Sequence, residues 1–152
     1  MKPCASRSQG TCSALTEGSD GILYGTTFFG GTSGAGTIYK LNKDGGSYTV
    51  LHGFAESSVD GAMPSSSLVE GKDGALYGTT QSGGSSGGAG TVFKLNKDGS
   101  GYTVIYSLSP TNHIGAVPAA GLLQLDGTFY GTTLSGGDMF QGTLFKLVPS
   151  GM

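Results

Sequence analysis

The sequence predicts an all-β fold, a β-propeller built from four-stranded antiparallel blades. Three observations predict it: the segment Tyr-Gly-Thr-Thr occurs three times, an alternating apolar and polar run follows each copy, and Asp-Gly turns separate the runs. The copies begin at Tyr24, Tyr77 and Tyr130, which places them 53 residues apart both times. Self-similarity at such a period is typical of propellers and solenoids. A solenoid fits less well, because its coils are shorter and successive hairpins do not join them.

The middle repeat shows the four strands that each unit is expected to form, at residues 67–70, 75–80, 90–95 and 102–106. The turns that contain Asp73-Gly74 and Asp98-Gly99 join the first strand to the second and the third to the fourth. Asp-Gly between alternating runs predicts a hairpin, because glycine supplies the positive φ that the turn requires. Four antiparallel strands in roughly 50 residues are typical of one propeller blade.

The repeats divide the chain into an N-terminal tail over residues 1–13 and a repeat domain over residues 14–152. We expect the three units at about residues 14–66, 67–120 and 121–152. The third unit ends where the second has its second Asp-Gly turn, so we expect eleven strands and an incomplete last blade. Three blades are too few for a ring, which usually holds about four to eight. We therefore expect a homo-oligomer, most simply two protomers that together give six blades.

The composition excludes several classes of partner. Eight Lys and Arg against ten Asp and Glu give a net charge of −2 without a basic run, which excludes nucleic acid. No apolar stretch approaches the roughly 18 residues of a membrane helix, so we expect no membrane insertion. Two cysteines, Cys4 and Cys12, without a histidine cluster predict no metal site. The 30 glycines form no phosphate-binding motif, so we expect no cofactor.

The set of motifs LYGTT, GG, GTVFKL and DG resembles a bacterial tandem repeat, the GloVer (Gloeobacter–Verrucomicrobia) repeat of surface proteins with a choice of C-terminal anchors. The resemblance extends from about Ala14 to the end of the chain. It implies a repeat array in an exported, surface-associated protein, and therefore an extracellular or cell-surface location. It implies no particular chemistry. The first residues lack the apolar segment of a signal peptide, and no anchor is visible.

Function is expected on the face that carries the loops after each second strand and the loops between blades, because these loops vary over a repeated scaffold. They comprise residues 28–36, 81–90, 134–142, 55–64 and 109–118. The leading hypothesis is a non-catalytic surface or recognition module with carbohydrate as its ligand class. The hydroxyls of Thr27, Thr80 and Thr133 would bind sugars, and Phe28, Phe29 and Phe140 would offer apolar surface. The alternative is that the threonines suit strands and close local turns.

The second hypothesis is a hydrolase, specifically a glycoside hydrolase. Glu56, Asp60 and Asp138 are the acids in those loops, and a glycosidase would use two of them, roughly 5–9.5 Å apart. His113 is a further acid–base candidate, although the sequence gives it no fixed partner. The alternative is that all four are solvated loop residues. A third hypothesis is a structural fragment of a longer protein. His52, inside an expected fourth strand, is predicted to be structural.

Overall fold

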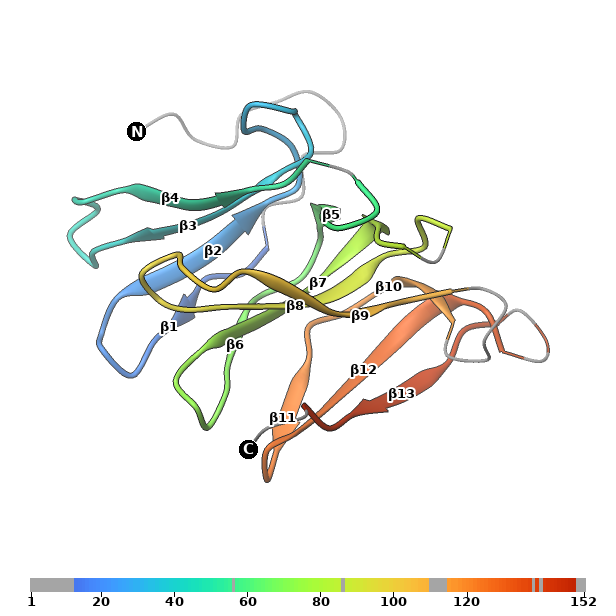
Figure 1. Cartoon of the computed structure of the whole chain (residues 1–152). Coiled ribbons are helices and arrows are strands. Elements are labelled where there is room, and N and C mark those ends of the chain that lie inside the picture. The colour runs from blue at the N-terminus through green and yellow to red at the C-terminus, as the bar shows by residue number, and fades with distance from the viewer. Residues whose placement is uncertain are drawn as a thin grey trace.

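The structure, a computed structural model, describes residues 13–55, 57–85, 87–109, 115–137, 139 and 141–149. These residues form thirteen strands and no helix, and the strands make three antiparallel sheets that lie side by side in chain order (Figure 1). The all-β prediction is confirmed. Within the described ranges, then, no helix is available that is long and apolar enough to cross a membrane.

Each sheet is built from strands that are consecutive along the chain, and β5 and β10 join the sheet of the repeat that follows them. Sheet 1 holds β1 (Thr16–Glu17), β2 (Leu23–Thr27), β3 (Thr37–Leu41) and β4 (Thr49–Gly53), hydrogen-bonded in that order. Sheet 2 holds β5 (Gly61–Pro64), β6 (Val69–Glu70), β7 (Leu76–Gly83), β8 (Thr91–Leu95) and β9 (Thr103–Ser107). Sheet 3 holds β10 (Ala116–Pro118), β11 (Leu123–Leu125), β12 (Thr128–Ser135) and β13 (Leu144–Leu147).

The two strands beyond the predicted eleven are β5 and β10, which lie in segments predicted as loops between blades. β5 and β6 pair one after the other with the same edge of β7, with Pro64 opposite Thr80 and Val69 opposite Tyr77. β10 and β11 pair with β12 in the same way. The sequence did not predict β5 and β10 as strands because each ends in proline. An edge strand tolerates proline at a position whose backbone N–H would face away from the neighbouring strand, because no ladder hydrogen bond is lost there.

Backbone hydrogen bonds at equivalent positions join neighbouring sheets. The Met63 N–H donates to the Ala35 carbonyl at 2.8 Å, and the Val117 N–H donates to the Ala89 carbonyl at 2.9 Å. Met63 and Val117 both adopt positive φ, 57° and 56°, which is uncommon for residues other than glycine. The same unusual backbone turn therefore connects sheet 1 to sheet 2 and sheet 2 to sheet 3.

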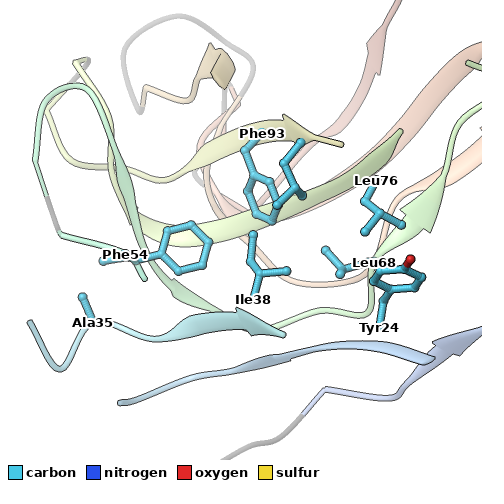
Figure 2. Packing of buried hydrophobic residues seen from close by; sticks show 9 residues of the cluster. Tyr24, Ala35, Ile38, Phe54, Leu68, Leu76 and Phe93 are labelled. Carbon is cyan, nitrogen blue, oxygen red and sulfur yellow. The ribbon is translucent and has the colours of Figure 1, made fainter. Parts of the chain in front are cut away.

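Two hydrophobic cores lie between the sheets rather than inside any one of them. Figure 2 shows the first core, where Tyr24, Ile38 and Phe54 of the sheet 1 repeat face side chains of the sheet 2 repeat. Those opposing side chains are Leu68, Leu76 and Phe93. The second core lies between sheets 2 and 3 and contains Tyr77, Val92, Leu122, Phe129 and Phe145.

The glycine of each Tyr-Gly-Thr-Thr segment makes room for an aromatic ring on the next strand. A Cβ added at Gly78 would lie 2.5 Å from Phe93 Cζ and 2.9 Å from Leu68 Cδ2. At Gly25 a Cβ would lie 2.6 Å from Tyr39 Oη, and at Gly131 it would overlap Phe145. The tyrosine before the glycine is buried at Tyr24 and Tyr77 and half-buried at Tyr130. Close packing therefore accounts for the repeated Tyr-Gly pair.

Candidate functional site

The loops predicted to carry function lie at one end of the sheets, and the Asp-Gly hairpins lie at the other end (Figure 1). The loops after β2, β7 and β12 share a backbone hydrogen bond at equivalent positions. The donor and acceptor glycines are Gly36 and Gly30 at 3.0 Å, Gly90 and Gly83 at 3.2 Å, and Gly142 and Gly136 at 3.1 Å. The three loops are therefore closed by equivalent backbone hydrogen bonds, and they differ in the side chains that they carry.

The three threonines predicted to bind ligand lie at or near the ends of β2, β7 and β12. Their hydroxyls are paired with the hydroxyls of threonines that begin β3 and β8 or directly precede β13. The pairs are Thr27 with Thr37 at 2.8 Å, Thr80 with Thr91 at 2.8 Å, and Thr133 with Thr143 at 2.9 Å. Thr80 and Thr133 are buried and also donate to the carbonyls of Ser82 and Ser135. A sugar bound there would have to displace these bonds, and the ligand-binding role of the threonines stays a prediction.

Two aromatic rings distinguish the loop of sheet 1 from the other two loops. Phe28 and Phe29 pack edge to face, with ring centroids 4.7 Å apart and an interplanar angle of 79°. Phe29 is 51 % exposed, so the pair presents an apolar surface beside the glycine-rich turn that begins at Gly30. The corresponding residues are Gln81 and Ser82 in the second repeat and Leu134 and Ser135 in the third.

A partly buried polar cluster joins sheets 1 and 2 near the same end. Asp60, immediately before β5, accepts hydrogen bonds from the N–H groups of Ala55 at 2.9 Å and Gly61 at 2.7 Å. His52 Nε2 on β4 lies 3.2 Å from Asp60 Oδ1. The His52 ring stacks on Tyr102, with centroids 3.7 Å apart and planes inclined by 10°. The cluster thus draws one ionisable side chain from each of three segments.

The surroundings of Asp60 favour its charged form. Burial by itself would raise the pKa of the carboxyl, but hydrogen bonds from His52 and from the two backbone amides hold the pKa below its usual range. An ionised carboxylate only accepts hydrogen bonds, so His52 Nε2 is the donor of the hydrogen bond to Asp60. Burial and the negative charge of Asp60 raise the pKa of Tyr102, whose buried hydroxyl faces the carboxylate without completing a well-formed hydrogen bond.

This arrangement suits Asp60 as a charged group that holds two sheets together, or as a general base, better than as a general acid. A general acid needs a raised pKa so that it carries a proton near neutral pH, whereas the pKa of Asp60 is lowered. Within the part of the chain that the structure describes, no group of three or more His, Cys, Asp or Glu side chains is placed to hold a metal ion.

Comparison with known families decides where the chain belongs. The model of the Gloeobacter/Verrucomicrobia repeat matches residues 5–152. The chain belongs to this family. The resemblance drawn from the sequence motifs is thereby confirmed, and the Gloeobacter/Verrucomicrobia repeat identifies the chain as a repeat module. A search of curated proteins found no match.

Several residues predicted for this Gloeobacter/Verrucomicrobia repeat protein lie outside the described residues. They are Glu56, His113, Asp138 and Phe140, together with Cys4 and Cys12 of the N-terminal tail. Of the proposed glycosidase carboxylates, the structure therefore places Asp60 alone. The catalytic roles stay predictions.

His52 and Tyr102 are the members of the cluster that sequence reasoning did not assign to a site. His52 lies in a fourth strand as predicted, but its ring bridges two sheets instead of only filling a strand position. No motif spacing predicts this cluster, because Asp60, His52 and Tyr102 become neighbours only when the sheets of the Gloeobacter/Verrucomicrobia repeat pack on one another. One signal was available: a histidine at position 52 where the second repeat has Tyr106 marks this interface as different.

Proposed function

We propose that the chain is a non-catalytic recognition module of a bacterial surface protein and that it binds carbohydrate through the loop of sheet 1. The observation that carries the proposal is the exposed Phe28–Phe29 pair beside a glycine-rich turn. Sugars offer an apolar C–H face that packs on an aromatic ring. Their hydroxyls accept hydrogen bonds from backbone N–H groups, which a glycine-rich loop exposes. Binding sites typically combine such an apolar platform with a few polar groups.

Membership of the repeat family supports the non-catalytic part of the proposal. The chemistry of Asp60 supports it as well, because its carboxylate is occupied by two backbone amides and His52. The extracellular or cell-surface location is proposed from the family, whose resemblance implies an exported protein.

Glycan binding is tested by probing an array of immobilised glycans with the whole chain and measuring the affinity of any hit by calorimetry. Replacing Phe29 by Ala removes the exposed ring, and we expect the affinity to fall at least tenfold. Met139→Ala is the matched control, because Met139 is an 80 % exposed apolar side chain on the equivalent loop of sheet 3. An array without hits, or a Phe29→Ala variant that binds as well as the wild type, would refute the proposal.

The second candidate is a glycoside hydrolase, and the position of Asp60 favours it over other enzymes. Asp60 is an ionised, buried carboxylate near the loop end, which fits a base or nucleophile. The proton donor would have to be Glu56 or Asp138. Turnover of a chromogenic glycoside that is abolished by Asp60→Asn, and also by either Glu56→Gln or Asp138→Asn, would establish this function instead of the first. Absence of turnover across α- and β-linked substrates would reject it.

We further propose that the three sheets are consecutive blades of a β-propeller whose ring is completed by oligomerisation. Antiparallel sheets stacked face to face, with hydrophobic cores between them, support this arrangement. A ring of six blades would form from two protomers, within the usual range of about four to eight.

A further inference from the structure

The two outermost sheet faces carry the apolar residues that neighbouring sheets bury against one another inside the chain. We propose that these outer faces are the two halves of one head-to-tail interface, and that a second copy of this chain occupies it. The proposal rests on the blade arrangement put forward above, and it assigns the partner surfaces that the arrangement needs.

Each internal interface joins two different kinds of face. We call the face of a sheet that packs on the following sheet its leading face, and the opposite one its trailing face. The leading faces carry Tyr24 and Ile38 in sheet 1 and the equivalent Tyr77 and Val92 in sheet 2. The trailing faces carry Leu68 and Phe93 in sheet 2 and the equivalent Leu122 and Phe145 in sheet 3. Leading meets trailing both times, through residues at the same repeat positions.

The outer face of sheet 1 is a trailing face without a cover from the described residues. Leu15 stands at the position of Leu68 and Leu122, beside the motif glycine in each repeat. Leu15 is 49 % exposed, whereas Leu68 and Leu122 are 3 % and 8 % exposed. Tyr39, at the position of Phe93, packs on this face against Tyr48, with ring centroids 5.3 Å apart and planes inclined by 34°.

The outer face of sheet 3 is the matching leading face. Leu144 stands at the position of Ile38 and Val92. Each of these three residues lies opposite the first threonine of its Tyr-Gly-Thr-Thr segment. Leu144 is 73 % exposed, whereas Ile38 and Val92 are fully buried. Tyr130, at the position of the buried Tyr24 and Tyr77, shares this face.

Other exposed apolar side chains gather on the same two faces. Val50 lies opposite Tyr39 on the outer face of sheet 1, and it is 49 % exposed. Leu123 lies opposite Tyr130 on the outer face of sheet 3, and it is 56 % exposed. Exposed apolar patches of this kind mark protein interaction sites.

The second copy follows from the complementarity of the two faces. The outer face of sheet 1 is a trailing face, and the outer face of sheet 3 is a leading face. In a second copy, the leading face of sheet 3 can therefore pack on the trailing face of sheet 1 of the first copy, just as leading and trailing faces pack on each other inside the chain. Leu15 of one copy is expected to pack against Tyr130 and Leu144 of the second copy, as Leu68 joins Tyr24 and Ile38 in the first core. Such a head-to-tail contact gives a closed ring when the rotation closes.

The test measures the mass of the whole chain by sedimentation velocity between 1 and 100 μM, for the wild type and for variants of each face. We expect an assembly of two or more copies for the wild type. Leu15→Lys and Leu144→Lys should each prevent ring closure and raise the dissociation constant at least tenfold. The control is Val59→Lys, since Val59 is a 78 % exposed apolar residue on a loop. It should assemble like the wild type. Far-UV circular dichroism verifies that every variant is folded.

Mixing the two face variants distinguishes this interface from a symmetric one. Leu15→Lys keeps an intact leading face and Leu144→Lys keeps an intact trailing face, so a mixture should form an open dimer through one native interface. A monomeric wild type at 100 μM, as expected if a further repeat of a longer chain covers these faces, overturns the proposal. Disruption by only one of the two variants, or a mixture without dimer, also overturns it.

Glycan binding measured on the same variants separates this inference from the proposed recognition function. Monomeric wild type that binds glycan refutes the interface alone, whereas an assembled protein that binds no glycan refutes the recognition function alone.

Discussion

Replacing Gly78 by Ala tests whether close packing explains the repeated Tyr-Gly pair. The new Cβ would lie 2.5 Å from Phe93 Cζ and 2.9 Å from Leu68 Cδ2, both closer than any Cβ contact that is tolerated without movement. Phe93 is fully buried and Leu68 is 3 % exposed, so neither side chain has free space into which it can withdraw. Gly78 does not have a positive φ, so the effect is one of packing and not of backbone strain.

The expected magnitude follows from two opposing effects. Overpacking a well-packed core costs typically about 1–3 kcal/mol, and the upper end applies because two fully packed neighbours are involved. Replacing glycine also lowers the conformational entropy of the unfolded chain, which stabilises the folded protein by about 0.4–1 kcal/mol. The free energy of unfolding should therefore fall by about 2 kcal/mol. For a chain of this size that corresponds to a decrease in Tm of about 4–8 °C.

The assay is urea and thermal unfolding followed by far-UV circular dichroism, since the chain has no tryptophan. Gly53→Ala is the matched control, because a Cβ there meets nothing within 4 Å and the backbone φ is not positive. Its stability should stay within about 0.5 kcal/mol of the wild type. Adding Phe93→Leu to Gly78→Ala should cost less than the sum of the single changes, because the smaller side chain relieves the overlap. Equal midpoints for Gly78→Ala and Gly53→Ala would show the packing argument to be wrong.

Two further predictions concern the charged groups between sheets 1 and 2. Asp60→Asn should lower the free energy of unfolding at pH 7 by about 1–3 kcal/mol, because one backbone N–H or His52 loses its acceptor. The pKa of Asp60 is lowered in the folded protein, so its stabilisation is present above the unfolded pKa of about 3.9 and is lost as pH falls through the folded value. Urea midpoints should therefore fall more steeply below about pH 5 in the wild type than in Asp60→Asn, and parallel profiles would contradict this. Lys97→Met removes the ion pair with Asp20 at 3.7 Å and the hydrogen bond to Ser19 at 2.9 Å, which join the turn between β8 and β9 of sheet 2 to the turn between β1 and β2 of sheet 1. It also removes the ion pair with Glu70 at 2.7 Å within sheet 2, and the change should cost about 1 kcal/mol at low salt and less at high salt. Lys43→Met, at an exposed pair within sheet 1, should cost less, and an equal loss would argue against a role between sheets.

The repeat period predicted most of the strands because side-chain alternation and Asp-Gly turns are local signals. The strands over residues 75–80 and 90–95 differ from β7 and β8 only at their ends. β5 and β10 escaped prediction because their backbone is set by the neighbouring sheet. The positive φ of Met63 and Val117 is maintained by a hydrogen bond across sheets, which no local pattern encodes.

The candidate site was less predictable than the strands. Asp60 was singled out as a loop acid, but its role depends on His52 and on Tyr102 of another repeat, which become neighbours only through sheet packing. The hydroxyl pairing of Thr80 with Thr91 likewise depends on the register between β7 and β8. Residue type and spacing determine which polar side chains the site contains. The packing of the sheets determines which of those side chains already have hydrogen-bond partners within the protein.

The use of equivalent residues at both internal interfaces also bears on how such a chain can lengthen. A tandem duplication of one 53-residue unit would insert a sheet whose two faces already match the sheets on either side. No new contact surface would have to arise, because each unit contacts only its neighbours. The number of units can therefore change in evolution in single steps, while side chains on the loop after each second strand diversify without disturbing the packing beneath them.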